Sequence, residues 1–129
     1  MTITEVSQEL ELSADTLRYY ERIGLILPIK RDKSGRRDYS KGDCEWIQFV
    51  RCMRTAGLSI ESLTEYVALV RQGEETAPVR KELLLRQREG LEERIEEMRR
   101  MLEYLNCKIE HYEAHLLPRE EALRKKQGE

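Results

Sequence analysis

An apolar stripe with heptad spacing runs through the C-terminal half of the chain and dominates its pattern of hydrophobic positions. Its members step by seven, four or three residues, and they are Leu84, Leu91, Ile95, Met98, Leu102, Leu105, Ile109 and Tyr112. Because such spacing keeps one face of an α-helix apolar, this seam predicts a coiled-coil helix over residues 78–115. Arg88 is its one polar position, and Pro78 suits the first turn.

A helix with so long a seam needs a partner to cover it. Folding back onto the N-terminal half is one alternative, but a small domain that ends at residue 72 cannot cover a stripe of this length. A second copy of the chain is the simplest partner. We therefore expect a homodimer held together by the coiled coil.

Two short amphipathic helices are predicted at the start of the chain. Val6 and Leu10 are spaced by four residues, and we expect Thr4 to cap their helix. Ser13 then caps a second helix over residues 14–22, which ends before a glycine. Two short helices joined by about three residues form a helix-turn-helix pattern.

A basic turn and two more helices complete the N-terminal half. Ser34 and Gly35 are a turn signal between two short polar strands over residues 29–39, which predicts a small β-hairpin, or wing. Ser40 and Ser59 are suited to cap a third and a fourth helix. The apolar positions of these two helices are Trp46, Ile47, Phe49, Val50, Met53, Ala56, Ile60, Leu63, Val67 and Val70.

The predicted fold class is mainly α: a winged helix-turn-helix head, with four helices and a small β-hairpin wing, followed by a long coiled-coil dimerisation helix. The head takes residues 1–72 and a connector takes residues 73–77. The dimerisation helix takes residues 78–115. A charged tail takes residues 116–129, and we expect it to be frayed.

Charge is unevenly distributed along a chain whose net charge is −2. Residues 1–72 carry 11 basic and 11 acidic side chains, yet six basic residues stand against two acidic ones between Lys30 and Lys41. A local excess of this kind beside a helix-turn-helix is typical of a surface that binds nucleic-acid phosphates. It argues against a competing hypothesis, a coiled-coil adaptor whose head binds protein.

Composition and residue types exclude several other classes of protein. No stretch approaches the roughly 18 apolar residues of a membrane span, and no secretory signal is present, so we expect a cytoplasmic protein. Three cysteines without CxxC spacing favour neither a disulfide framework nor a zinc ribbon. No histidine precedes His111, which rules out a Cys–His pair within the head. We predict no enzyme activity and no cofactor.

Three segments of the head resemble the MerR family of transcriptional regulators. Residues 13–26 (SADTLRYYERIGLI) resemble the family's signature, residues 35–40 (GRRDYS) its wing, and residues 57–60 (GLSI) the start of its fourth helix. The DNA contacts that this resemblance implies are Thr16, Arg18, Tyr19, Tyr20, Arg36, Arg37 and Tyr39. Lys33, at the tip of the wing, is added from its charge and position alone.

The same resemblance implies a mode of action. A homodimer with an antiparallel coiled coil would bind double-stranded DNA at a pseudo-palindromic operator between promoter elements whose spacer is overlong. Bending and untwisting that DNA would let RNA polymerase engage both elements. RNA polymerase is then an indirect partner, reached through the promoter DNA.

The signal is expected to act on a thiol. About 14 residues follow His115, too few for a ligand-binding domain, and residues 73–80 and 116–129 lack the cysteines of the family's metal sensors. Cys52 lies between two arginines in the third helix. The short aldehyde- and electrophile-responsive subgroup of the family is similar in having a cysteine at this place. We expect Cys52 to be the sensor, because nearby cations favour a thiolate and added bulk would disturb a packed edge.

Alternatives to this sensor stay open at this point. Cys52 as a small filler of the core edge is one, and Cys44 as the reactive thiol, in the first turn of a helix, is another. A metal response or a ligand response is a third. Cys107, His111 and His115 are spaced by four residues, but solvated side chains explain them better, and we predict no metal site.

Overall fold

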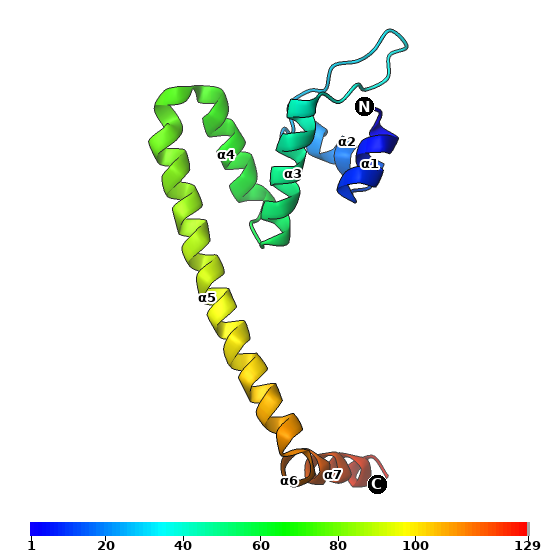
Figure 1. Cartoon of the computed structure of the whole chain (residues 1–129), viewed down its shortest axis with the longest axis vertical. Helices are drawn as coiled ribbons and strands as arrows, with labels where there is room; N and C mark the ends of the chain where they lie inside the picture. Colours follow the sequence, from blue (N-terminus) through cyan, green and yellow to red (C-terminus); the bar gives the residue numbers. More distant parts are fainter. Residues whose placement is uncertain (129) are drawn as a thin grey trace. The chain divides into compact units, whose positions relative to one another are not determined.

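A head of four helices forms the N-terminal part of the structure, a computed structural model that describes residues 1–128. Its helices are α1 (Ile3–Leu10), α2 (Ala14–Arg22), α3 (Lys41–Thr55) and α4 (Ile60–Gln72). α1 packs on both α2 and α3 (Figure 1). The prediction of a mainly helical protein with a helix-turn-helix head is therefore confirmed.

The first helix begins earlier than predicted, and Thr4 as its cap is wrong. Thr2 caps α1 instead: its hydroxyl oxygen accepts the Glu5 N–H at 3.2 Å, and the Glu5 carboxylate accepts the Thr2 N–H at 2.9 Å. Such a reciprocal capping box satisfies two N–H groups at once. Thr4 has Ser7 three residues later, which offers no carboxylate for the second bond.

The core of the head is built from two buried residues of each helix and from residues of the segments between the helices. Its buried residues are Val6, Leu10, Leu17, Tyr20, Leu25, Ile26, Ile29, Tyr39, Ile47, Val50, Leu58, Leu63 and Val67. Ser40 caps α3 as predicted, since its hydroxyl accepts the Asp43 N–H at 3.1 Å. Trp46 lies at the edge of the core, where its Nε1–H donates to the carbonyl of Leu25 at 3.0 Å.

The wing forms without strands. Among the described residues no β-strand is present, and residues 29–39 form a loop closed by one antiparallel bridge between Arg31 and Arg37. Oδ1 of Asp32 accepts the backbone N–H groups two and four residues later, at 2.8 and 3.0 Å. The Asp32 side chain thus takes the Arg36 N–H that a partner strand would otherwise use. The ladder is limited to two backbone bonds beside the bridge, from the Asp32 N–H to the Arg36 carbonyl and from the Asp38 N–H to the Lys30 carbonyl, both at 2.8 Å. We keep the name wing for residues 29–39.

A long helix follows the head, as the heptad spacing predicts. η1 (Glu74–Thr76) occupies most of the predicted connector, and α5 (Ala77–Glu110) follows it. The Thr76 hydroxyl donates to the carbonyl of Leu69 at 2.7 Å, which ties this reversal of the chain to the end of α4. α5 has 34 residues, yet neither it nor any other described helix is apolar enough to cross a membrane.

The C-terminal segment is helical where we expected a frayed tail. The structure divides into two compact units, residues 1–87 and the segment from Arg88 onward. In this segment α5 is followed by α6 (Tyr112–His115) and α7 (Leu117–Gln127), so the helix predicted to run to residue 115 is interrupted at His111. Pro118 lies in the first turn of α7, which suits helix initiation. The Tyr112 hydroxyl donates to the Glu120 carboxylate at 2.5 Å and joins α6 to α7.

Candidate DNA-binding surface

The exposed face of α2 carries three of the predicted contacts. Thr16 is half-buried, and its hydroxyl lies 2.7 Å from that of Ser13, which caps the helix as predicted. Arg18 is exposed and donates to the Asp15 carboxylate at 3.1 Å. Tyr19 is also exposed, with the Arg22 guanidinium over its ring at 5.4 Å. The arginine and the tyrosine ring therefore stay at the surface.

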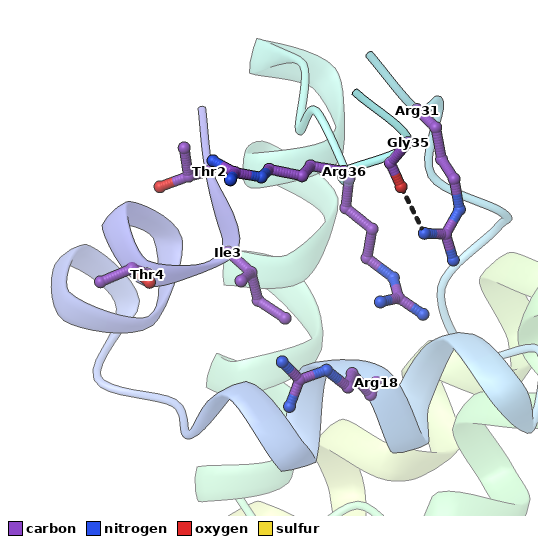
Figure 2. Close-up of a pocket in the computed structure, with 8 residues that line it drawn as sticks. Thr2, Ile3, Thr4, Arg18, Arg31, Gly35 and Arg36 are labelled. Atoms are coloured by element: carbon purple, nitrogen blue, oxygen red, sulfur yellow. Dashed lines mark hydrogen bonds between the residues drawn. The ribbon is translucent and has the colours of Figure 1, made fainter. Parts of the chain in front are cut away.

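Arginines from α2 and from the wing gather around one groove. The groove has a volume of about 460 Å³, and its lining includes Arg18 of α2 together with Arg31, Arg36 and Arg37 of the wing. Figure 2 shows Arg18 on one side of this groove and Arg31 and Arg36 on the other. We call it the arginine groove. Four cationic side chains around one hollow make a site suited to phosphate oxygens.

Arg31 is a residue of this groove that the sequence reasoning did not select. Its Nη1–H donates to the carbonyl of Gly35 at 2.7 Å, drawn as a dashed line in Figure 2. Its charge belongs to the basic excess between Lys30 and Lys41, which is the sequence signal for it. The segment that resembles the family's wing begins at Gly35 and therefore does not include Arg31. Lys33 is exposed at the wing tip and does not line the groove.

Arg37 is tied to α2 by an ion pair. Its Nε–H donates to Oε1 of Glu21 at 2.8 Å, and the two side chains are only 22% and 17% exposed. The other carboxylate oxygen, Oε2, accepts the backbone N–H of Ile29 at 3.4 Å. Part of the Arg37 charge is therefore neutralised within the protein, unlike that of Arg36.

Two of the predicted contact residues lie in the core. Tyr20 is 7% exposed and Tyr39 is 2% exposed, so both rings pack against apolar neighbours. The Tyr39 hydroxyl is buried without a hydrogen-bond partner, and burial raises its pKa. In this conformation that hydroxyl cannot reach a phosphate. The family motif indicates that a tyrosine is present but not which way its ring points.

The seam of α5 and α6 is uncovered within one chain. Leu84 and Leu91 are half-buried. The remaining positions are between 41% and 69% exposed, and they are Ile95, Met98, Leu102, Leu105, Ile109 and Tyr112. A continuous apolar stripe of this kind marks a surface that associates with another element.

Comparison with known proteins assigns the family. A model of the MerR helix-turn-helix family of regulatory proteins matches residues 1–69, and a model described as MerR, DNA binding matches residues 44–106. The chain belongs to the MerR family. The first match contains both α2 and the wing, and the second runs from α3 into α5.

Similar MerR proteins are transcriptional regulators. AdhR of Bacillus subtilis (strain 168) is 52% identical over 91 residues, a match that covers 70% of this chain but only 65%, just under two thirds, of AdhR. A MerR regulator of Listeria monocytogenes has a crystal structure that is 50% identical (TM-score 0.83), covering 98% of this chain and 96% of that one. HiNmlR, a MerR regulator that lacks the sensor domain, was solved bound to promoter DNA. It is 27% identical (TM-score 0.80), covering 87% of this chain and 89% of its own. These matches confirm the prediction of a MerR-family regulator.

The three thiols of this MerR chain differ in their surroundings. Cys52 is exposed, and its sulfur accepts a hydrogen bond from the Gln48 amide at 3.6 Å. The two flanking arginines are engaged elsewhere: Arg51 pairs with the Glu11 carboxylate at 2.9 Å, and Arg54 donates to the Leu58 carbonyl at 2.8 Å. Neither the expected cationic pocket nor the expected packed edge therefore surrounds Cys52 within one chain.

Cys44 and Cys107 complete the set of thiols. Cys44 is half-buried, and burial, together with the nearby Glu9 carboxylate, raises the pKa of its thiol above the usual value. This direction is opposite to the one expected from its place in the first turn of α3. Cys107 is exposed, and near it the His111 and His115 rings lie 5.2 Å apart. Within residues 1–128 no group of three or more His, Cys, Asp or Glu is arranged to hold a metal ion.

The raised pKa of Cys44 predicts an order of chemical reactivity. A higher pKa leaves less thiolate at neutral pH, and the thiolate is the attacking species. Iodoacetamide at pH 7.5 should therefore modify the half-buried Cys44 several-fold more slowly than the exposed Cys52, and the rate at Cys44 should rise as the pH is raised. Peptide mass spectrometry measures both rates, with the exposed Cys107 as the internal control. Equal rates at Cys44 and Cys52 at pH 7.5 would contradict the prediction.

Proposed function

We propose that this MerR-family chain is a DNA-binding transcriptional regulator that acts as a homodimer on a pseudo-palindromic promoter operator. The observation that carries the proposal is the arginine groove, where guanidinium groups from α2 and the wing converge. Guanidinium groups pair with phosphate oxygens in a bidentate geometry, and arginine also reads guanine edges in the major groove. HiNmlR, whose structure is similar, was solved on promoter DNA, which supports the same use of this face.

The predicted contacts take different parts in this proposal. Thr16, Arg18 and Tyr19 of α2 would face the major groove, and Arg31, Lys33 and Arg36 would hold phosphates from the wing. Arg37 would contribute the part of its guanidinium that Glu21 leaves available. Tyr20 and Tyr39 would support these elements from the core, in place of the phosphate contacts that the family resemblance implies.

Dimerisation through the seam would bring two heads to one operator. The apolar positions from Ile95 to Tyr112 are uncovered within one chain, and transfer of such side chains out of water is worth about 1.5–3 kcal/mol each when burial is complete. Two antiparallel copies would cover one another's seams. A two-fold symmetric protein would then match a pseudo-palindromic site.

Distortion of a promoter with an overlong spacer is the proposed mechanism of regulation. Phosphate clamps from two heads would favour bent and untwisted DNA, because only that form meets both heads at once. The deformation energy would come from these contacts. RNA polymerase would respond to the changed DNA, without needing a surface of its own on this chain.

Cys52 is the proposed sensor thiol for aldehydes and other electrophiles. Its exposure makes the sulfur accessible to a reagent. Overpacking of a buried edge, the mechanism expected from the sequence, does not fit an exposed side chain. Addition to the thiolate would instead change the α3 surface on which Gln48 contacts the sulfur.

Removing single arginines should separate base contacts from phosphate contacts. Arg18→Ala should weaken binding to the operator by about 1–3 kcal/mol, and by less on a shuffled duplex, if Arg18 contacts a base. Arg36→Ala should weaken both duplexes alike and lower the salt slope by about one, since it removes a phosphate contact. Fluorescence anisotropy at several salt concentrations measures both effects. Arg86→Ala, which removes an exposed charge outside the groove, is the control, and equal affinities for all three variants would refute the docking.

A charge placed in the seam should break the dimer. Leu102→Glu should shift the protein from dimer to monomer at micromolar concentration, because two carboxylates would be buried in an apolar interface. Arg100→Glu introduces the same residue away from the heptad seam, so that variant should stay dimeric. Sedimentation velocity distinguishes the two species. A monomeric wild type, or a dimeric Leu102→Glu protein, would refute the proposed interface.

Loss of one thiol should abolish the response to electrophiles. Cys52→Ser should keep dimerisation and operator affinity, because the side chain is exposed and the change is small. It should lose the promoter response to an aldehyde in a reporter assay. Cys107→Ser removes another exposed thiol and should respond like the wild type. An undiminished response in Cys52→Ser would refute Cys52 as the sensor, and Cys44 would then be the next thiol to test.

A further inference from the structure

A single carboxylate joins the two elements proposed to meet DNA. Glu21 lies in the last turn of α2. Its carboxylate accepts hydrogen bonds from both ends of the wing, from the backbone N–H of Ile29 and from the Nε–H of Arg37. Among the described residues this is the one ion pair between α2 and the wing. Both side chains are mostly buried, so the pair is less screened by water and salt than an exposed one.

The wing lacks the strand ladder that usually fixes such a loop. Its internal bonds, from the Asp32 carboxylate and the single bridge, set its own shape. They do not set its orientation relative to α2. An element that must be ordered during association lowers affinity, whereas one held in place beforehand does not. Ile29 and Tyr39 anchor the two ends of the wing in the core, and the N-terminal amino group binds Asp38 and the Tyr39 carbonyl at 3.0 and 2.9 Å. The Glu21 bonds tie these ends directly to α2.

An acidic residue at this place is unfavourable for phosphate binding by itself. Glu21 repels phosphates and neutralises part of Arg37, one of the four arginines of the groove. A surface selected only for attraction to DNA would do better with a neutral residue. The carboxylate is therefore accounted for by what it holds rather than by what it attracts.

We propose that Glu21 is a positioning residue that locks the wing onto α2, so that both elements meet the operator as one preformed unit. The inference rests on the proposed DNA-binding function. It assigns Glu21 a part in operator affinity without any contact between Glu21 and DNA. Arg37 is its partner: it pairs with Glu21 to hold the wing against α2, and it also contributes to phosphate binding.

Two explanations of Glu21, electrostatic attraction and positioning, predict opposite changes in affinity when the carboxylate is removed. Glu21→Ala removes one negative charge from the DNA face, so electrostatics alone predicts tighter binding. Positioning predicts operator affinity about tenfold weaker, the change expected from loss of a charge-assisted bond, with affinity for a shuffled duplex unchanged or tighter. Asp15→Ala is the matched control: it also removes a carboxylate of α2, one that pairs with Arg18 but not with the wing. This control should bind the operator as tightly as the wild type or tighter.

The measurement is anisotropy with full-length protein, on a duplex from the region upstream of its own gene and on a shuffled duplex. Arg37→Lys is the second variant, because it keeps the charge but cannot reproduce the planar Nε–H donor. It should lose operator affinity as Glu21→Ala does, even if that variant is found unfolded by circular dichroism. Folded Glu21→Ala that binds the operator as tightly as Asp15→Ala, or Arg37→Lys that binds like the wild type, overturns the inference. A wild type that does not distinguish the two duplexes overturns the proposed function itself.

Discussion

Two buried side chains in α2 decide what the head presents to DNA. Leu17 and Tyr20 anchor this nine-residue helix in the core, and the residues between them, Arg18 and Tyr19, are exposed. A helix this short is not stable alone in water, so its orientation comes from that burial and from the cap at its N-terminus. The proposed contacts on one face of α2 therefore depend on apolar packing on the opposite face.

Helix positions and the core were predictable because they follow local rules. A cap residue and apolar spacing identify α2, α3 and α4, and each begins directly after its predicted serine cap. Features that depend on competition between neighbours were not predictable. The Asp32 side chain accepts the Arg36 N–H that the expected strands would have used, and Thr2 caps the helix in place of Thr4 because Glu5 can complete a capping box.

The candidate site was predictable in outline rather than in detail. Arg18 and Arg36 lie around one groove as the motif indicates, but the pattern does not show that Arg31 joins them. Residue type also does not reveal the direction of a side chain: the motif predicts a DNA contact at Tyr39, whose ring lies in the core. The surroundings of Cys52 depend in part on Glu11, which lies 40 residues from its partner Arg51, and sequence spacing cannot supply such a pairing.

The balance of charge within the head has a consequence for how the protein is distributed in a cell. Residues 1–72 carry equal numbers of basic and acidic side chains, so beyond the Debye length of about 8 Å at physiological salt the head attracts DNA little. Attraction is confined to the arginine groove at close range. Occupancy of random chromosomal sites should therefore stay low, and a small number of regulator molecules can keep a few operators filled without being titrated by the rest of the genome.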